Sequence, residues 1–387
     1  MLINLEIPAE ATISEGNDGV LYVENQLDMA EYPANIATWL RENAAKFPDK
    51  PFLKERDGDG WRSVSYSETL AKVNQISNSL LALDLEPDAP IGILSNNSIN
   101  MALIQFGGMQ IGHPVVPISF AYSVRSQTGS LIKHILDVTD APLLVMSDAN
   151  LHMPKLNQWD NSGRKFYAFT SSEAHENVHD FGELLNGETE LSAEAEARFQ
   201  AVTADTLAKI QFTSGSTNLP KGVEVTHGMQ TSNQVAIYQV WPFLSSEDVL
   251  CDWLPWNHTF GGNFVTNLAL MHGATMHIDN GNPTPAGLEN TVKNIIDVRP
   301  TIYFGVPASY AALYSQMQTD DELREAFFGR LKFIFVAAAA LDQKTYEGML
   351  AMGKETTGQE IPFFSAWGTT ETAPCSTLVY WLADDIR

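Results

Sequence analysis

The sequence predicts an α/β fold made of two halves, each with a parallel sheet covered by helices on both faces. The first observation is an alternation of short apolar runs with longer amphipathic runs, which is typical of parallel strands joined by helices. The second is that this alternation occurs on both sides of a more polar, less regular stretch at about residues 149–203, interpreted as an excursion between the halves. The third is size and composition, because 387 residues with 44% hydrophobic content suffice for a large packed core.

The first half should contain a capped helix followed by alternating strands and helices. Ser65 and Glu68 have the spacing of a capping box, in which each side chain bonds the backbone N–H of the other residue, so a helix should begin there. The elements expected after this helix are strand 91–95, helix 98–110, strand 114–119, helix 130–138 and strand 142–148.

The second half repeats the pattern. The expected strands are 207–213, 249–255, 275–279, 301–306, 331–337 and 362–368, and the expected helices are 226–240, 262–271, 286–298, 307–317 and 342–352. Ligands of such sheets bind beyond the carboxyl ends of the strands. The loops of interest are therefore 213–222, 255–263, 305–308, 337–341 and 367–373.

Charge and cysteine content limit the function classes. The formal net charge is −24, from 47 acidic and 23 basic residues, so nucleic acid and anionic membranes would be repelled. The two cysteines, Cys251 and Cys375, provide neither a disulfide framework nor a CxxC metal site, and a cytoplasmic location is expected. The sequence does not indicate an oligomeric state.

One stretch without charged side chains lies between Asp88 and Arg125. A membrane span needs about 20 nearly unbroken apolar residues. Several polar side chains interrupt this stretch, and Pro114 and Pro117 break it. We therefore expect a buried strand, helix and strand here, and no membrane partner.

The most informative motif is a hydroxyl-rich loop that ends in a lysine. It reads Thr213-Ser214-Gly215-Ser216-Thr217-Asn218-Leu219-Pro220-Lys221-Gly222. Glycines let backbone N–H groups turn toward an anion, hydroxyls donate to its oxygens and the lysine adds a mobile charge. The nucleotide P-loop needs Gly before its Lys and a hydroxyl after it. Pro220 and Gly222 occupy those positions, so the loop does not fit the P-loop pattern. It is either a phosphate loop of another kind or, judged from these residues alone, a structural turn.

Three further stretches stand in the predicted strand-end loops. The segment Trp367-Gly368-Thr369-Thr370-Glu371-Thr372 follows an apolar strand, and Ala337 to Leu341 is a turn of small residues. Small residues let a flat purine approach the backbone, although alone they are equally typical of core or helix. The third stretch runs from Trp253 to Gly262 and contains His258, which alone is as readily a core histidine as a ligand-binding one.

Taken together and in this order, the motifs resemble those of the adenylate-forming superfamily, which includes acyl-CoA synthetases, luciferases and peptide-synthetase adenylation domains. The loop matches the superfamily signature Tyr/Phe-Thr-Ser-Gly-Ser/Thr-Thr-Gly-x-Pro-Lys-Gly except at Asn218, where the family usually has Gly. Asn tolerates positive φ better than other non-glycine residues, so the loop could keep its shape. The segment Trp367 to Glu371 resembles the family's second signature, Tyr/Trp-Gly-x-Thr-Glu.

The resemblance implies a role for each residue of the motifs. In the ATP-binding loop, phosphate oxygens would be held within the set Thr213, Ser214, Gly215, Ser216, Thr217 and Lys221. Thr370 would contact the α-phosphate, and Glu371 would hold Mg²⁺. Further nucleotide contacts would come from Trp367, Gly368 and Thr369 and from a purine wall of Ala338, Ala339 and Ala340. The acyl group would be bordered by His258, Phe304 and Gly305, and the residues acting in the chemistry would be Lys221, Thr370, Glu371 and His258.

A narrower similarity, from about residue 30 onward, is to feruloyl-CoA synthases. It is carried by stretches such as DWLPWNHTFGGN (252–263), HIDNGNPTP (277–285) and WGTTETAP (367–374). It implies an ATP-dependent ligase that activates ferulate or p-coumarate as an acyl-adenylate and transfers the acyl group to CoA. The fold implied is the family's large N-terminal domain, with two stacked α/β subdomains in αβαβα layers.

The expected domains are an N-terminal extension at 1–30 and the AMP-binding domain at 31–387. Family members continue past the second signature into a final subdomain and a small C-terminal domain with a catalytic lysine. The resemblance therefore implies that these 387 residues lack those parts and adenylate slowly.

Three alternatives remain open. The chain could be a remnant that binds ATP or acid with little catalysis, or an aryl- or fatty-acid ligase of another specificity. His175-Glu176-Asn177-Val178-His179 also fits the H-E-x-x-H pattern of zinc proteases. Its surroundings are polar and short for the helix that such a site needs.

Overall fold

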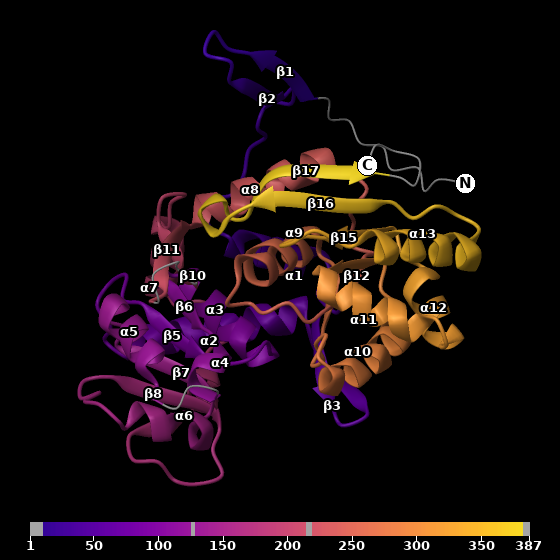
Figure 1. The fold of residues 1–387 in the computed structure, drawn as a ribbon. Coiled ribbons are helices and arrows are strands. Elements are labelled where there is room, and N and C mark those ends of the chain that lie inside the picture. The colour runs from indigo at the N-terminus through magenta and orange to yellow at the C-terminus, as the bar shows by residue number, and fades with distance from the viewer. Residues whose placement is uncertain (1–10, 125–127, 214–218, 382–387) are drawn as a thin grey trace.

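The computed structural model describes residues 11–124, 128–213 and 219–381, and it confirms the α/β fold with two mainly parallel sheets (Figure 1). In hydrogen-bonding order, the strands of the first sheet are β11 (Lys221–Thr226), β10 (Leu207–Thr213), β6 (Val115–Ile118), β5 (Ile91–Leu94), β7 (Leu143–Asp148), β8 (Lys165–Thr170) and β9 (Val178–Asp180). Those of the second are β17 (Cys375–Trp381), β16 (Phe363–Gly368), β15 (Phe333–Val336), β14 (Ile302–Gly305), β12 (Val249–Asp252), β13 (Thr275–Ile278), β3 (Pro51–Asp57) and β4 (Gly60–Ser65).

The helices form three layers around the two sheets. The outer layer on the first sheet consists of α4 (Phe120–Val124), α5 (Ser130–Thr139) and α6 (Ala149–Leu156). The central layer consists of α1 (Ala37–Lys46), α2 (Tyr66–Ala82), α3 (Ile99–Met109), η1 (Phe181–Leu185), α7 (Ala193–Ala201), α8 (His227–Val240), the π-helical segment η2 (Phe260–Val265) and α9 (Thr266–His272). The outer layer on the second sheet consists of α10 (Pro285–Val298), α11 (Pro307–Met317), α12 (Asp321–Phe328) and α13 (Gln343–Thr357).

The alternation of side chains along the strands explains this layering. Successive residues of a strand point to opposite faces. In β5, Ile93 faces the central layer and Leu94 faces α5 and α6. In β14, Phe304 faces the central layer and Tyr303 faces the outer helices of the second sheet. Both faces of each sheet are therefore buried, as near-continuous apolar strands require.

The stretch at 149–203 is not an excursion, so this expectation was wrong. Its strand β8 pairs in parallel with β7, and β9 pairs with β8, so the stretch extends the first sheet. Phe166, Tyr167 and Ala168 are buried and anchor β8. Its helix α7 contacts α2 in the central layer.

The two sheets also exchange segments of chain. The hairpin β3–β4 precedes every strand of the first sheet in sequence, yet β3 pairs with β13 at the edge of the second sheet. Conversely, β10 and β11 lie after the polar stretch in sequence but belong to the first sheet. The halves expected from the sequence are therefore real as sheets but not as continuous stretches of chain.

Most expected elements agree with the structure within a few residues, but several elements were not expected at all, among them α1, β3, β4 and α7. Strands β11 and β17 were not expected, and neither was helix α12. The charge-free stretch is a buried strand, helix and strand, as expected, with α3 buried along nearly its whole length. Within the described ranges, no helix has both the length and the apolar character needed to cross a bilayer.

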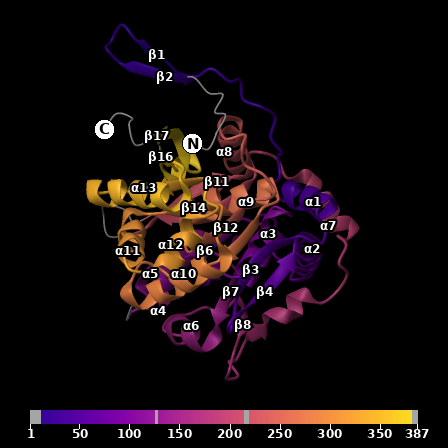
Figure 2. The same cartoon turned by 90° about the vertical axis from the view of Figure 1, so that its right-hand side faces the viewer.

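A separate hairpin of β1 (Ala11–Glu15) and β2 (Leu21–Asn25) projects from the body of the molecule in both views (Figures 1 and 2). All residues of its two strands are exposed, including Ile13, Leu21 and Val23. The segment after it is fastened to α8, because Gln239 Nε2 donates to Asp28 O at 2.8 Å and Ala30 N donates to Gln239 Oε1 at 3.1 Å.

The capping box at the start of α2 is present, and it yields a stability prediction. Ser65 Oγ accepts from Glu68 N at 3.2 Å, and Glu68 Oε2 accepts from Ser65 N at 2.8 Å. We expect Ser65→Ala to lower the free energy of unfolding by about 1 kcal/mol, measured by urea denaturation, because an N-terminal helix N–H loses its acceptor. Ser63→Ala, at an exposed position of β4, is the matched control and should change it by less than about 0.5 kcal/mol. Equal values for the two variants would contradict this role.

Candidate functional site

The candidate loops meet because three parallel strands end at the same edge of the second sheet. Gly305 at the end of β14 pairs with Val336 at the end of β15, and β16 pairs with β15 on its other side. Ala337 N donates to Gly305 O at 3.3 Å, so the loops after β14 and β15 begin in direct contact. The loop after β16 carries the Thr370–Glu371 motif.

The lysine loop is the turn of an antiparallel hairpin. Thr213 ends β10 and Lys221 begins β11, and the two residues are paired across the hairpin. Ser214, Gly215, Ser216, Thr217 and Asn218 lie outside the described residues. Lys221 is exposed and begins a strand, whereas the lysine of a nucleotide P-loop stands at the start of a helix. The geometry therefore agrees with the rejection of the P-loop pattern.

This hairpin is held at its turn by a helix of the outer layer, and its second strand lies near the second motif. His134 of α5 bonds Pro220 O through Nε2 at 2.9 Å, which holds the end of the loop against the first sheet. Residues of β11 lie within 8 Å of η3 (Thr370–Thr372) between Cα atoms. The strand that follows the first motif and the turn that carries the second, far apart in sequence, are thus neighbours in the structure.

The Thr-Glu motif forms a single tight turn. Thr369 N donates to Thr372 Oγ1 at 2.8 Å, and Thr372 N donates to Thr369 O at 3.1 Å. Within this turn Thr370 is half-buried and Glu371 is exposed. Hydrogen bonds to its own backbone N–H and to the Thr369 side chain lower the pKa of the Glu371 carboxyl, which is therefore ionised at neutral pH. Trp367, just before the turn, is 67% exposed.

Two contacts fix the position of this turn. Gly368 lies so close to the Pro374 carbonyl that a Cβ on residue 368 would overlap with that oxygen. Asn233 of α8 donates through Nδ2 to Cys375 O at 2.7 Å and to Thr372 O at 3.3 Å, and its Oδ1 accepts from Cys375 N at 3.3 Å. A single amide side chain thus ties the central helix layer to the turn that carries Glu371.

The alanine turn follows β15. Ala338 has φ +76°, a left-handed conformation that is unfavourable for a residue with a Cβ. Ala338, Ala339 and Ala340 are all exposed. An exposed turn of small side chains beside the ends of β14 and β16 leaves the backbone open to a flat ligand.

The segment with His258 lies against an aromatic cluster. Phe260 packs near Phe335 and Phe304, with ring centroids 5.5 and 6.3 Å apart. Phe304 is 1% exposed and Gly305 is buried, so Phe260, which is half-buried, is the cluster member nearer to solvent. More than a third of His258 is exposed, yet partial desolvation lowers the pKa of its imidazole, which is therefore neutral at pH 7.

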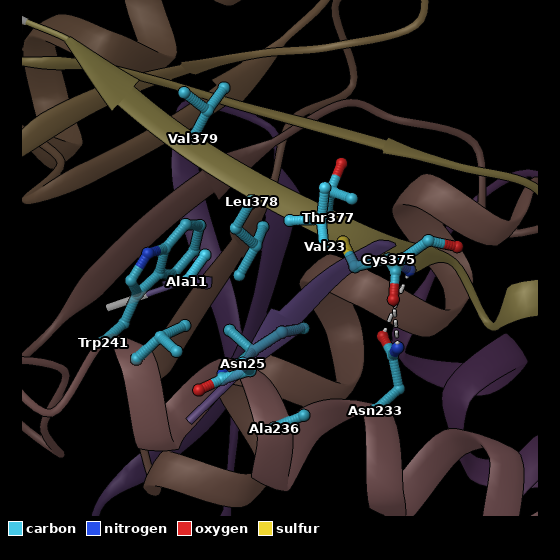
Figure 3. A pocket seen from close by; sticks show the side chains of 13 residues that line it. Ala11, Val23, Asn25, Asn233, Ala236, Trp241, Cys375, Thr377, Leu378 and Val379 are labelled. Carbon is cyan, nitrogen blue, oxygen red and sulfur yellow. Dashed lines mark hydrogen bonds between the residues drawn. The ribbon is translucent and has the colours of Figure 1, made fainter. Parts of the chain in front are cut away.

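An apolar cavity of about 280 Å³ adjoins the turn with Glu371 (Figure 3). Its lining comes from α8, β17 and the N-terminal hairpin, and includes Trp241, Leu378 and Val23. Asn233 and Cys375, the pair that holds the turn, form its end in the close-up view. An apolar ligand in this cavity would therefore lie beside the second motif.

The zinc-protease interpretation is wrong. His175 and His179 do not share a helix, because Asn177 between them has φ +66° and β9 begins at Val178. His175 Nε2 bonds Asn150 Oδ1 at 2.7 Å instead. Within the described part of the chain, no three His, Cys, Asp or Glu side chains are grouped to hold a metal ion.

The site residues given by the sequence thus lie in adjoining strand-end loops, apart from Ser214, Gly215, Ser216 and Thr217, which lie outside the described ranges. Sequence reasoning missed three residues that hold these loops, namely His134, Asn233 and Phe260. His134 and Asn233 act on backbone atoms of residues far along the chain, and no local pattern signals such contacts. Phe260 could have been found, since it follows His258 by two residues in the same motif.

Comparison with known proteins gives one family match. The family described as AMP-binding enzyme matches residues 40–387. The long-chain-fatty-acid–CoA ligase heimdall of Drosophila melanogaster is 24% identical over 330 residues, covering 81% of this chain and 47% of that protein. The chain spans about half of the length, or less, of this ligase and of two further curated relatives that it matches.

Solved structures support the fold. The anthranilate CoA ligase AuaEII, solved with anthranoyl-AMP, gives a TM-score of 0.73 at 20% identity, covering 93% of this chain and 64% of that one. A long-chain-fatty-acid-CoA ligase (FadD1) from Archaeoglobus fulgidus gives a TM-score of 0.74 at 19% identity, covering 91% and 67%. Both share the overall fold of this chain.

The close approach at Gly368 yields a prediction on stability. Gly368→Ala should displace the turn that carries Glu371, because a backbone carbonyl cannot move aside as a flexible side chain can. We expect unfolding to become easier by about 1–3 kcal/mol in thermal or urea denaturation. Gly60→Ala, where the nearest atom to a new Cβ is 3.6 Å away, is the matched control and should stay near the parent value. If Gly368→Ala behaves like this control, the turn is not fixed by this approach.

Proposed function

Because the chain belongs to the AMP-binding enzyme family, we propose that it binds ATP and a carboxylic acid at these strand-end loops and joins them as an acyl-adenylate, the first step of an AMP-forming acid–CoA ligase. One observation carries the proposal. The strand β11 that begins with Lys221 and the turn with Glu371 are neighbours at the carboxyl edge of the second sheet, so a cation and a carboxylate would be available to a phosphate chain bound between them.

In the proposed reaction a carboxylate oxygen of the acid attacks the α-phosphorus of ATP. The bond between the α-phosphorus and the bridging oxygen to the β-phosphate breaks, and pyrophosphate leaves with the electron pair. Little covalent help from the protein is needed, so positioning and charge neutralisation should provide most of the catalysis. Lys221 would offset the negative charge of the leaving pyrophosphate. The hydroxyls of Thr213, Ser214, Ser216 and Thr217 would donate hydrogen bonds to phosphate oxygens.

The second motif would act at the α-phosphate. The half-buried Thr370 hydroxyl would donate to an α-phosphate oxygen, and the backbone around Trp367, Gly368 and Thr369 would contact the nucleotide. The ionised, exposed carboxylate of Glu371 fits Mg²⁺, which proteins usually bind through one or two carboxylates together with substrate phosphates. When bound, the ion would offset the charge that develops on the phosphate oxygens.

Adenine would lie against the alanine turn. Ala338, Ala339 and Ala340 expose backbone at the end of β15, next to Gly305. A larger side chain here would stand between the purine and the backbone. The second step would then follow at the same site, where the CoA thiol attacks the acyl carbonyl and AMP leaves.

For the acid we propose a hydroxycinnamate such as ferulate or p-coumarate. The support is the aromatic character of the residues proposed to border the acid. Phe260 lies beside Phe304 and Phe335, and the neutral imidazole of His258 belongs to the same segment as Phe260. An aryl group gains from edge-to-face packing with such rings. The relatives support two neighbouring classes as alternatives, since one acts on anthranilate and others on long-chain fatty acids. The cavity beside Asn233 would suit an apolar chain.

A second candidate function is binding of ATP and acid with little turnover. Binding and pyrophosphate exchange separate the two. A ligase exchanges pyrophosphate into ATP when the acid is present, whereas a binder shows affinity without exchange.

The role of Glu371 is tested by an isosteric substitution. Glu371→Gln should lower acid-dependent pyrophosphate exchange by about 100-fold or more, because an anionic ligand for Mg²⁺ is lost at the α-phosphate. Calorimetry should show a parallel loss of Mg²⁺–ATP affinity, which gives a readout without turnover. Glu322→Gln, at an exposed position of α12, is the control and should match the parent. Unchanged Mg²⁺–ATP affinity in Glu371→Gln would refute the assignment.

The acid is tested with a panel of ferulate, p-coumarate, anthranilate and decanoate. We expect the affinity for ferulate and p-coumarate to exceed that for decanoate by about 10-fold or more, since ring packing would favour the aryl acids. Equilibrium dialysis measures this without turnover, and pyrophosphate exchange measures it with turnover. Preference for decanoate would transfer the proposal to the fatty-acid class.

A further inference from the structure

The π-helical segment η2 has an unusual set of hydrogen-bond partners. Four consecutive carbonyls, from Gly261 to Phe264, each accept from a side chain. Thr266 Oγ1 donates to Gly261 O at 2.8 Å, and Lys209 Nζ donates to Gly262 O at 2.8 Å. Gln234 Nε2 donates to Asn263 O at 3.0 Å and to Phe264 O at 3.1 Å. π-Helical turns are rare and are often found at functional sites. The side chains that bond these four carbonyls are therefore candidates for a functional role.

Lys209 is the least expected of these donors. It lies on β10, is 2% exposed and donates a hydrogen bond to Gly262 O. Among the described residues, no ion pair within 4.0 Å involves its ammonium group. Desolvation by burial lowers the pKa of Lys209 to about 7. Burying an amine without a carboxylate partner disfavours folding. An apolar residue at position 209 would avoid this cost, so the lysine is expected to have a role other than stabilising the core.

The opposite side of η2 lies directly on backbone. A Cβ on Gly261 would overlap with Leu254 O, and one on Gly262 would overlap with Trp256 O. Asn97 holds the loop segment 254–256 in place, because its Nδ2 donates to Leu254 O at 2.8 Å and its Oδ1 accepts from Trp256 N at 2.9 Å. The segment is therefore clamped between a fixed loop and the three side-chain donors.

We propose that Lys209 is a positioning residue for acid binding. Together with Gln234 it holds η2, and η2 in turn holds His258 and Phe260 where they would border the bound carboxylic acid. This deepens the proposed function and rests on it. The link is short, since Phe260 is the first residue of η2 and His258 O accepts from Gly262 N at 2.8 Å, the residue whose carbonyl Lys209 holds. A long, unbranched amine reaches from β10 to this carbonyl, whereas an apolar side chain at 209 would leave the carbonyl without this donor.

The first test measures the position of the segment without any ligand. In Lys209→Met, which keeps the length of the side chain and removes the donor, hydrogen–deuterium exchange of peptides covering 258–267 should become faster by about 10-fold or more. Gln234→Met should affect the same peptides, because it removes the donor to the next two carbonyls. Peptides of α11 serve as the internal reference and should not change. Unchanged exchange at 258–267 in Lys209→Met overturns the proposal, whether or not the chain binds an acid.

The second test separates positioning from general stability. Lys209→Met should weaken binding of ferulate by about 10-fold while the affinity for Mg²⁺–ATP and the thermal midpoint stay at or above the parent values, because a buried amine without a carboxylate is removed. The surface variant Lys165→Met makes the same chemical change at an exposed position of β8 and should match the parent in all three.

A parallel loss of ferulate affinity, Mg²⁺–ATP affinity and thermal stability in Lys209→Met would assign the residue to the core alone and overturn the proposal. Faster exchange at 258–267 with no loss of ferulate affinity would overturn its link to acid binding. A parent protein that binds neither ferulate nor decanoate counts against the proposed function and against that link, while the exchange result still decides whether Lys209 holds η2.

Discussion

The site depends on the hydrogen-bonded pairing of parallel strands, which places all of their carboxyl ends at the same edge of a sheet. β14, β15 and β16 pair in this way, so three loops from separate parts of the sequence start side by side. The fourth participant, the β10–β11 hairpin, belongs to the other sheet and reaches this edge because β11 lies next to η3. The place for the phosphates is therefore set by backbone pairing in two sheets, and the side chains of the motifs act on a position that the backbone has already defined.

Two unfavourable backbone conformations lie at the same edge. Ala338 and Ala373 both have left-handed φ values, and Gly368 tolerates no side chain. Each left-handed non-glycine residue costs on the order of 1–2 kcal/mol. The rest of the fold offsets this through strands buried on both faces and through side chains such as Asn233 that reach across layers to hold single carbonyls. Local rules are broken at the ligand edge, and long-range contacts compensate.

Elements that obey a strong local rule were predictable from the sequence. Apolar runs gave the parallel strands, and the Ser65–Glu68 pair gave the start of α2. Strand β11 was missed because only Val223 and Val225 alternate with polar residues in it, and its first two residues, Lys221 and Gly222, were assigned to the loop. The polar stretch was misjudged because β8 is short and its burial depends on β7. Within the site, the motif residues were available from resemblance, whereas the supports His134, Asn233 and Lys209 were not, because each acts on a carbonyl distant in sequence.

The hairpin β3–β4, which crosses to the second sheet, has a consequence for how the chain folds. Leu53 of β3 pairs with Met276 of β13, and the first sheet is built largely from the chain between them. The hairpin leaves a ribosome long before its partner strand exists, so the edge of β3 that β13 later covers must wait unpaired through the synthesis of most of the first sheet. Contacts of such sequence separation make folding slow, and unpaired strand edges promote association with other chains. The order of synthesis thus leaves this edge of β3 exposed while the first sheet is made. Newly made chains should need protection there until β13 has paired with β3.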